Sequence, residues 1–289
     1  MNIGIETKFT YTTAIGELVF EYDSAFWVTE IDGISSVDID VSESRSPGQI
    51  GSSITSQSVQ PRNFTIDGCI FEPVDSNREK LIDVFAPQVP ATLTITSGTQ
   101  SYFLDVIPTR TPEISLGQGL RNFQVQLRAA YPYWRSTRQY STQIAGLTAL
   151  FKFPFYTGGT WWISKYSDNY FRTITNKGNV PIEFNVLFSA RSAVVNPELY
   201  HMDTRRHILI KKTIMAGEMV LVSTIYGNKG VTITHPDGTT ENGFRYLSID
   251  SDLNMALLPG DNLLRMGADQ NREGLNIRLQ SPEGVRSGV

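Results

Sequence analysis

The chain has 289 residues, of which 40% are hydrophobic and 19% are charged. This length fits one large or two medium domains, and the apolar share is enough to bury a core. Few charges beside many polar uncharged residues suit sheets with one solvated face. The net charge of −4 argues against a broad nucleic-acid-binding surface. Because Cys69 is the single cysteine, an intrachain disulfide is excluded.

No run of apolar residues approaches the ~20 needed to cross a bilayer. The N-terminal residues have no basic segment followed by an apolar run, so they do not resemble a secretory signal. We therefore expect a protein that is made and used away from membranes.

Alternation of apolar and polar residues predicts strands along most of the chain. In the first half, the predicted strands cover residues 17–22, 26–31, 37–41, 63–71, 91–97, 101–107 and 123–127. In the second half, they cover residues 182–188, 207–211, 218–225, 230–234 and 275–279. The Asp32-Gly33 pair between two apolar runs predicts a hairpin turn. Many short strands separated by turns indicate a β-sandwich or a barrel.

One short helix is predicted near residues 76–86. Ser76 and Glu79 have the spacing of a capping box, in which each side chain bonds the backbone of the other. Leu81, Ile82 and Phe85 follow as the predicted buried face, and Pro87 ends the helix. The fold class is therefore all-β with one short helix.

Two polar segments interrupt this pattern. Ser42–Pro61 is rich in Ser and Gly, and it is either an arm that orders against a neighbouring subunit or a flexible loop. The second segment, Tyr131–Gln143, follows the last clear strand of the first half. We place a domain boundary at Trp134, which predicts domains at residues 1–134 and 135–289.

Catalytic and metal-binding patterns are weak. His201, His207 and His235 lack the spacing of a helical zinc pair. Residues 250–254 have the Asp-x-Asp-x-Asn spacing that begins a calcium loop, but Met255 stands where the turn needs glycine. We therefore expect no enzymatic activity, no cofactor and no metal.

Aromatic residues are concentrated between residues 156 and 171. Trp161, Trp162 and Tyr166 are the candidate contact residues, because aromatic faces stack on sugar rings and also dominate protein interfaces. This segment is interpreted as core plus interface, with binding of a saccharide as the alternative.

Several motifs, in their order and spacing, resemble the distal tail protein family of siphovirus-type phages. Those in the first half are Pro47-Gly48 with Gly51, Pro61-Arg62-Asn63-Phe64-Thr65-Ile66-Asp67-Gly68, the helix from Ser76 to Phe85, and Ala130-Tyr131-Pro132-Tyr133-Trp134. Those in the second half are Asn176-Lys177-Gly178-Asn179-Val180-Pro181-Ile182, Ile214-Met215-Ala216-Gly217-Glu218 and Leu258-Pro259-Gly260-Asp261-Asn262. Tyr131 departs from the family, which often has an aspartate there, and the Trp161-Trp162 pair has no counterpart that we can assign.

The resemblance implies an N-terminal β-sandwich domain whose six copies close into a ring around the tail channel. It also implies a C-terminal galectin-like β-sandwich that docks other baseplate proteins. The expected partners are other copies of the chain, the tail tube protein, the tail tip protein and a receptor-binding protein, without any membrane or sequence-specific nucleic acid. The expected location is the virion tail, after synthesis in the cytoplasm of the host bacterium. The alternatives are a module that binds host cell-wall saccharide and another β-rich tail component, such as a tube protein.

Overall fold

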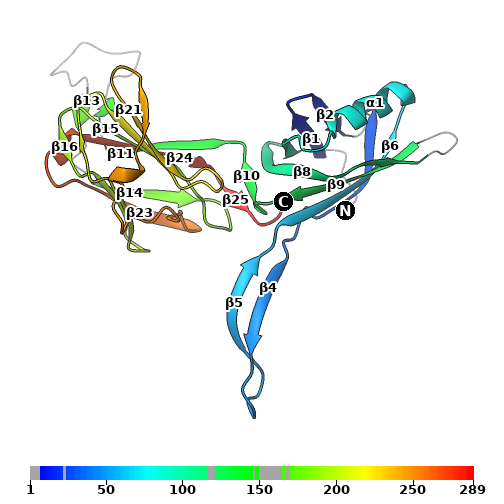
Figure 1. The fold of residues 1–289 in the computed structure, drawn as a ribbon, viewed down its shortest axis with the longest axis horizontal. Helices are drawn as coiled ribbons and strands as arrows, with labels where there is room; N and C mark the ends of the chain where they lie inside the picture. The colour runs from blue at the N-terminus through cyan, green and yellow to red at the C-terminus, as the bar shows by residue number, and fades with distance from the viewer. Residues whose placement is uncertain (1–6, 22–23, 116–120, 146, 150–163, 167–169) are drawn as a thin grey trace, which may run out of the picture. The chain divides into compact units, whose positions relative to one another are not determined.

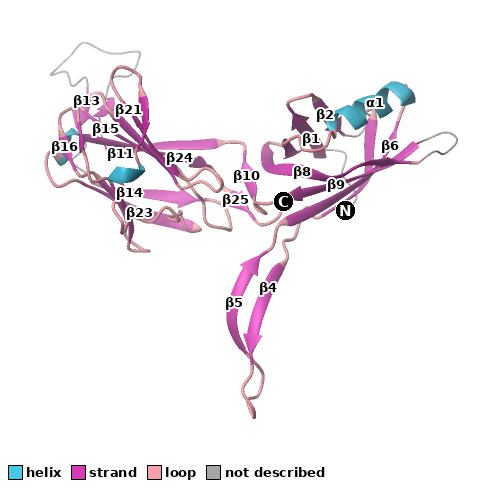
Figure 2. Cartoon of the chain, in the orientation of Figure 1, coloured by secondary structure: helices cyan, strands magenta, loops and turns pink. Residues whose placement is uncertain are grey.

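A computed structural model describes residues 7–21, 24–115, 121–145, 147–149, 164–166 and 170–289. These residues are mostly β-strand with one α-helix, so the predicted fold class is confirmed (Figure 2). The chain divides into two compact units, of which the first contains Met1–Arg138 and Val285–Val289 and the second contains Gln139–Gly284. The first compact unit extends to Arg138, and the domains expected at residues 1–134 and 135–289 stay a prediction. The alternation of residues did not indicate that residues 285–289 return to the first unit.

The first unit is built on a nine-stranded sheet with the order β2-β1-β7-β8-β9-β6-β3, in which β10 also pairs with β8 and β25 pairs with β10 (Figure 1). All of its neighbouring strands are antiparallel. Its strands are β1 (Thr7–Thr13), β2 (Glu17–Phe20), β3 (Phe26–Asp32), β6 (Arg62–Ile70), β7 (Ala91–Ser97), β8 (Gln100–Ile114), β9 (Arg121–Ala129), β10 (Trp134–Ser136) and β25 (Val285–Arg286). A separate two-stranded sheet joins β4 (Ile39–Ser44) to β5 (Ser53–Val59).

The predicted hairpin turn at Asp32-Gly33 is wrong, because β3 pairs with β6 and not with β4. The glycine is needed for another reason. Gly33 has a φ of 88°, and a Cβ placed there would lie 2.0 Å from the carbonyl oxygen of Asn63. This close approach of two backbones requires a residue without a side chain.

The helix α1 (Val74–Val84) contacts β2, β6 and β8. The predicted capping box is wrong, because the N-cap is Pro73 and no side chain caps the helix, which leaves Ser76 inside its first turn. The buried residues are Leu81, Val84 and Phe85, while Ile82 is 39% exposed. Positions i, i+3 and i+4 share one helix face, so Val84 replaces the predicted Ile82 in the core. Phe85 stacks on Tyr11 of β1 with ring centroids 4.1 Å apart.

A buried arginine, Arg62, connects distant parts of the first unit. Its Nε donates to the carbonyl oxygen of Pro132 at 2.8 Å, and its Nη1 donates to those of Gly33 and Ile34 at 2.6 Å each. Its Nη2 donates to the carbonyl oxygen of Ser287. One side chain at the start of β6 therefore binds the segment before β4, the segment before β10 and the segment after β25.

Arg62 also lies against two aromatic rings, Phe64 and Trp134, with its guanidinium carbon 5.8 and 5.9 Å from their centroids. The indole N–H of Trp134 donates to the carbonyl oxygen of Ile34 at 3.0 Å. Burial lowers the pKa of Arg62 to about 10, while the negative charge of Asp38 opposes this shift. The guanidinium is therefore still charged at neutral pH, and the four carbonyl bonds offset the cost of burying it.

The second unit contains a six-stranded sheet, β11-β24-β15-β20-β21-β22, and a four-stranded sheet, β14-β23-β17-β18. The strands of the six-stranded sheet are β11 (Gln139–Ala145), β15 (Asn185–Ala190), β20 (Met219–Ser223), β21 (Gly230–Thr234), β22 (Thr240–Asn242) and β24 (Leu275–Pro282). Those of the four-stranded sheet are β14 (Phe171–Asn176), β17 (Glu198–His201), β18 (Arg206–Leu209) and β23 (Gly260–Gly267). Two short pairs join β12 (Leu147–Ala149) to β13 (Ser164–Tyr166) and β16 (Val194–Val195) to β19 (Thr213–Ile214), and the 3-10 turns are η1 (Phe244–Tyr246) and η2 (Arg272–Gly274).

Buried amides hold the turns of the second unit. Asn262 is fully buried, and its Nδ2 donates to the carbonyl oxygens of Leu258 at 2.8 Å and Gly260 at 2.9 Å. Its Oδ1 accepts from the backbone N–H of Leu258 at 2.7 Å. Asn176 donates in the same way to the carbonyl oxygens of Val180 and Leu257 at 2.9 and 3.0 Å. These bonds satisfy backbone groups that the sheets leave unpaired.

We predict that Arg62→Met destabilises the first unit by about 3 kcal/mol, because four buried or partly buried carbonyl groups lose the hydrogen bond that Arg62 donates. Hydrogen-exchange mass spectrometry should show faster exchange around residues 33–34 and 285–289, with exchange in residues 170–284 unchanged. The control is Arg110→Met, since Arg110 makes an exposed ion pair with Glu113 at 3.2 Å and such pairs contribute little. Equal effects of the two substitutions would contradict this role of Arg62.

Candidate assembly surface

The β4–β5 hairpin of the first unit projects away from that unit's main sheet (Figure 1). Every residue of both strands is exposed. The expectation that Ser42–Pro61 lacks strands is wrong, since half of it forms the end of β4 and all of β5. The reason is that hydrogen bonds between the two backbones order the segment without requiring an apolar core.

The register of the hairpin gathers its apolar side chains on one face. Ile39 is opposite Val59, and Val41 is opposite Gln57. A β-bulge follows, after which Glu43 is opposite Ile54. Cross-strand partners share a face, and alternate residues of one strand share a face. The bulge therefore brings Ile54 to the face that carries Ile39, Val41 and Val59.

The opposite face of the hairpin carries polar residues. Its cross-strand pairs join Asp40 to Ser58 and Ser42 to Ser56. The apolar residues on the first face are exposed by 54% at Ile39, 44% at Val41, 61% at Ile54 and 38% at Val59. A lone two-stranded hairpin is marginally stable in water, and a row of exposed apolar residues marks an interaction surface. We call these four residues with Glu43 the hairpin face.

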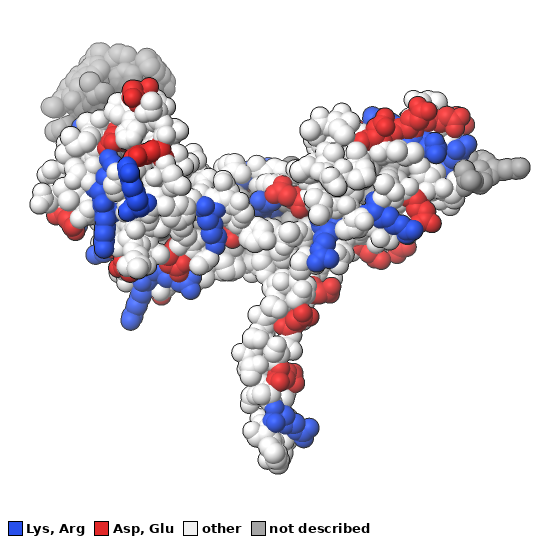
Figure 3. Space-filling model, in the orientation of Figure 1, with Lys and Arg blue, Asp and Glu red and all other residues white. Residues whose placement is uncertain are grey.

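Charge along the hairpin is mainly negative. Acidic side chains are spaced along it, with a basic side chain near its tip (Figure 3). Asp38, Asp40 and Glu43 supply the negative charges, and Arg45 supplies the positive one. Glu43 accepts a hydrogen bond from Ser52 Oγ at 2.6 Å, so its carboxylate is held by one neutral partner.

The base of the hairpin is fixed where it joins the first unit. The backbone N–H of Gln60 donates to the carbonyl oxygen of Asp38 at 2.9 Å, and its Nε2 donates to Asp40 Oδ2 at 2.6 Å. Arg62 follows two residues later with its bonds to Gly33 and Ile34. The hairpin thus extends from an anchored base, although its strands lack buried residues.

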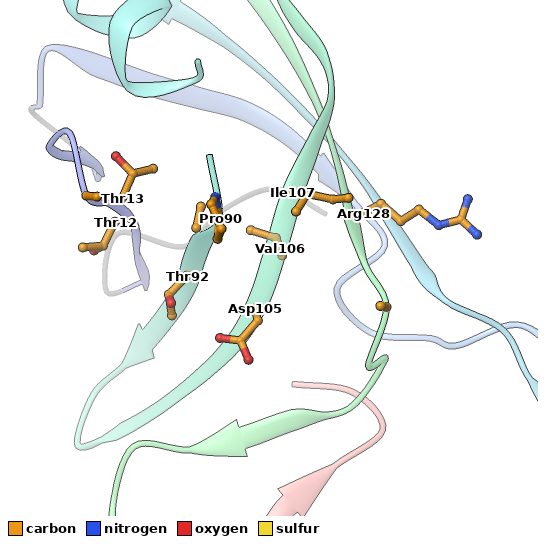
Figure 4. Close-up of a pocket in the computed structure, with 11 residues that line it drawn as sticks. Thr12, Thr13, Pro90, Thr92, Asp105, Val106, Ile107 and Arg128 are labelled. Carbon is orange, nitrogen blue, oxygen red and sulfur yellow. The ribbon is translucent and has the colours of Figure 1, made fainter. Parts of the chain in front are cut away.

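An open pocket of about 460 Å³ lies on the main sheet of the same unit (Figure 4). It is lined by Thr12, Thr13, Ala14, Pro90, Ala91, Thr92, Asp105, Val106, Ile107, Arg128 and Ala130. Ile107 is 52% exposed and is the cross-strand partner of Arg128. The guanidinium of Arg128 extends away from the other lining residues (Figure 4). The pocket therefore combines apolar and hydroxyl groups with one outward-pointing cation.

The candidate residues from the sequence lie elsewhere. Trp161 and Trp162 are outside the described residues, and of Tyr166 only its place in β13 is described. The saccharide interpretation of these three residues therefore stays a prediction. The residues of the hairpin face were missed: alternation does mark Ile39 and Val41, but the bulge that adds Ile54 has no sequence signature.

The polar side chains of the calcium-like segment at residues 250–254 already lie against other side chains of the second unit. Asp252 pairs with Arg206 at 3.2 Å, Lys229 donates to Asn254 Oδ1, and Asp250 lies 3.4 Å from His207. Among the described residues, no group of three His, Cys, Asp or Glu side chains is placed to hold a metal.

His235 belongs to a buried polar cluster in the second unit. Glu218 is nearly buried, and it accepts bonds from Lys212 at 2.9 Å, from His235 Nδ1 at 3.0 Å and from the backbone N–H of Met215 at 2.8 Å. Burial by itself raises the pKa of Glu218, but the bonds from Met215, Lys212 and His235 outweigh burial and lower it below the usual value. This cluster holds the turn before β20.

No helix in the described part of the chain is long and apolar enough to span a membrane.

No protein-family model matches the chain, and neither does any curated protein. Solved structures do match. The Dit (gp 19.1) protein of phage SPP1, described as a paradigm of the hub adsorption apparatus of phages that infect Gram-positive hosts, aligns with a TM-score of 0.64 at 15% identity, over 95% of this chain and 98% of that chain. A chain of the phage P2 baseplate in its activated conformation aligns with a TM-score of 0.54 at 10% identity, over 95% and 97%, both in the calcium and in the strontium structure. The chain therefore has the fold of the SPP1 Dit protein.

We predict that Glu218→Gln lowers the stability of the second unit by about 2 kcal/mol at pH 7, the usual value of hydrogen bonds to a charged group. A carboxyl whose folded pKa is lowered stabilises the protein above its unfolded pKa, and this contribution is lost as the pH falls through the folded pKa. The difference in unfolding free energy between the wild type and Glu218→Gln should therefore shrink below about pH 4.

Urea unfolding of both chains between pH 3 and pH 8 measures this difference. Glu273→Gln is the matched control, since Glu273 is exposed and no change is expected there. A difference between wild type and Glu218→Gln that does not depend on pH would contradict the charged role of Glu218.

Proposed function

We propose that this chain is a structural protein of the tail baseplate of a long-tailed phage. Its copies form a hexameric ring that joins the tail tube to the tip and receptor-binding proteins. The observation that carries the proposal is the match to the SPP1 Dit protein along 95% of this chain and 98% of that one. Because the match extends over nearly the full length of both chains, it includes both units of this chain in the same order. The role is structural and not enzymatic, and the place of action is the virion tail.

The hairpin supports assembly independently of that match. An arm with an anchored base and an uncovered apolar face is only marginally stable by itself, and it gains stability when another surface covers it. An interface between two different patches of identical subunits generates a ring when its rotation closes. The hairpin therefore acts as the contact between neighbouring subunits, as the arm alternative for Ser42–Pro61 proposes.

Closure of a ring by six chains of 32.3 kDa would give a particle of roughly 194 kDa. Light scattering with negative-stain imaging measures the mass and the symmetry. A chain that stays monomeric over the whole accessible concentration range contradicts the ring.

We predict that Ile54→Ser weakens assembly by about tenfold per contact, because it removes one apolar side chain from the covered face. The stability of the monomer should change by less than about 0.5 kcal/mol, since Ile54 is exposed there. Ile249→Ser is the control, because Ile249 is fully exposed in the second unit. Unchanged assembly of Ile54→Ser in sedimentation velocity would remove the hairpin from the subunit contact.

A further inference from the structure

We propose that the hairpin face of one copy docks on the pocket of a second copy, with Glu43 of the first against Arg128 of the second. This inference rests on the proposed function, and it names the surface that receives the hairpin. Within a single chain both surfaces are uncovered, since Ile54 is 61% and Ile107 is 52% exposed. The two surfaces are therefore available to each other only between copies.

The two surfaces carry similar cross-strand residue pairs. On the hairpin, Glu43 is the cross-strand partner of Ile54. Beside the pocket, Arg128 is the cross-strand partner of Ile107. Each surface thus pairs one charged residue with one exposed isoleucine, and the two charges are opposite. The proposed docking takes the orientation in which Ile54 packs against Ile107 and the carboxylate of Glu43 meets the guanidinium of Arg128.

The pocket has the chemistry that the hairpin face needs. Ala14, Pro90 and Ala130 are exposed and offer apolar contacts to the remaining side chains of the hairpin, and Thr12 and Thr92 offer hydroxyl groups beside them. A pocket of about 460 Å³ is large enough for several branched side chains. A continuous apolar ridge against a wall of this kind excludes water from the charged pair and strengthens it.

Arg128 is the cation of the pocket that is free to take a partner. Asp105 also lines the pocket, but its carboxylate is paired with the guanidinium of Arg135. Arg128 is exposed and forms no ion pair or hydrogen bond with the side chains of the described residues. The edge of the pocket therefore presents a positive charge at Arg128, which complements the acidic hairpin.

The interface is of the head-to-tail kind, because each copy contributes its hairpin to one neighbour and its pocket to the other. Such a contact forms closed rings or open filaments, depending on the rotation between copies. It also explains why a hairpin without a core is retained as an ordered, amphipathic element.

Charge reversal tests this pairing. Glu43→Arg and Arg128→Glu should each weaken assembly by at least about tenfold, because each places like charges against each other. An equimolar mixture of the two variants should assemble again, since in an alternating ring every hairpin then meets a pocket of opposite charge. Sedimentation velocity and native mass spectrometry measure the three samples, and thermal unfolding checks that each variant is folded.

Ser56→Arg is the control, because it introduces an arginine on the opposite, polar face of the hairpin, where Ser56 is opposite Ser42. It should assemble like the wild type. If the wild type assembles and both single variants assemble equally well, this docking is overturned. The ring then stands, and another protein covers the hairpin face. Loss of assembly in both variants without rescue in the mixture also overturns the pairing. A wild-type chain that never assembles contradicts the proposed function itself, and the docking falls with it.

Discussion

The first unit depends on a buried cation that binds backbone carbonyls from three separate segments. Arg62 needs those carbonyls because a buried guanidinium without acceptors is costly, and the carbonyls need Arg62 because no sheet partner is available to them. Its acceptors include Gly33 before the hairpin and Ser287 near residue 289. The position of the hairpin base and the return of residues 285–289 are therefore consequences of one side chain. Lysine could not replace it, since a single ammonium lacks the planar fork of donors.

In the second unit, buried polar side chains of other residue types also form hydrogen bonds with backbone groups. Asn262 and Asn176 bond backbone carbonyls in buried turns, and Glu218 accepts a backbone N–H beside its two cationic partners. These residues and Arg62 all belong to the short motifs that carry the sequence resemblance. Surface and core residues vary easily at 15% identity, whereas a buried polar group that completes a turn has few substitutes. This explains how turn motifs identify a fold when no family model matches.

The sequence predicts the strands well and their connections poorly. Alternation identifies most strands because burial of one face imposes it locally. The Asp32-Gly33 pair was misleading, since the glycine serves a close approach to the backbone of Asn63 and not a hairpin. Ile82 was misplaced because the helix buries the face that carries Leu81, Val84 and Phe85, and Ile82 lies beside that face. Both errors depend on what the segment packs against, which local patterns do not contain.

The hairpin face shows why an assembly surface is harder to predict than a core. A core strand reveals itself because apolar residues keep a constant period, but the bulge after Ser42 shifts the period of β5 by one residue. If the two-residue alternation of a strand were unbroken, Ile54 would lie on the same face as Ser56 and Ser58, and β5 would look polar on both faces. With the bulge, the apolar residues align and the serines occupy the other side. Because this arm is ordered without a core of its own, the first unit folds around Arg62 while the hairpin face stays exposed.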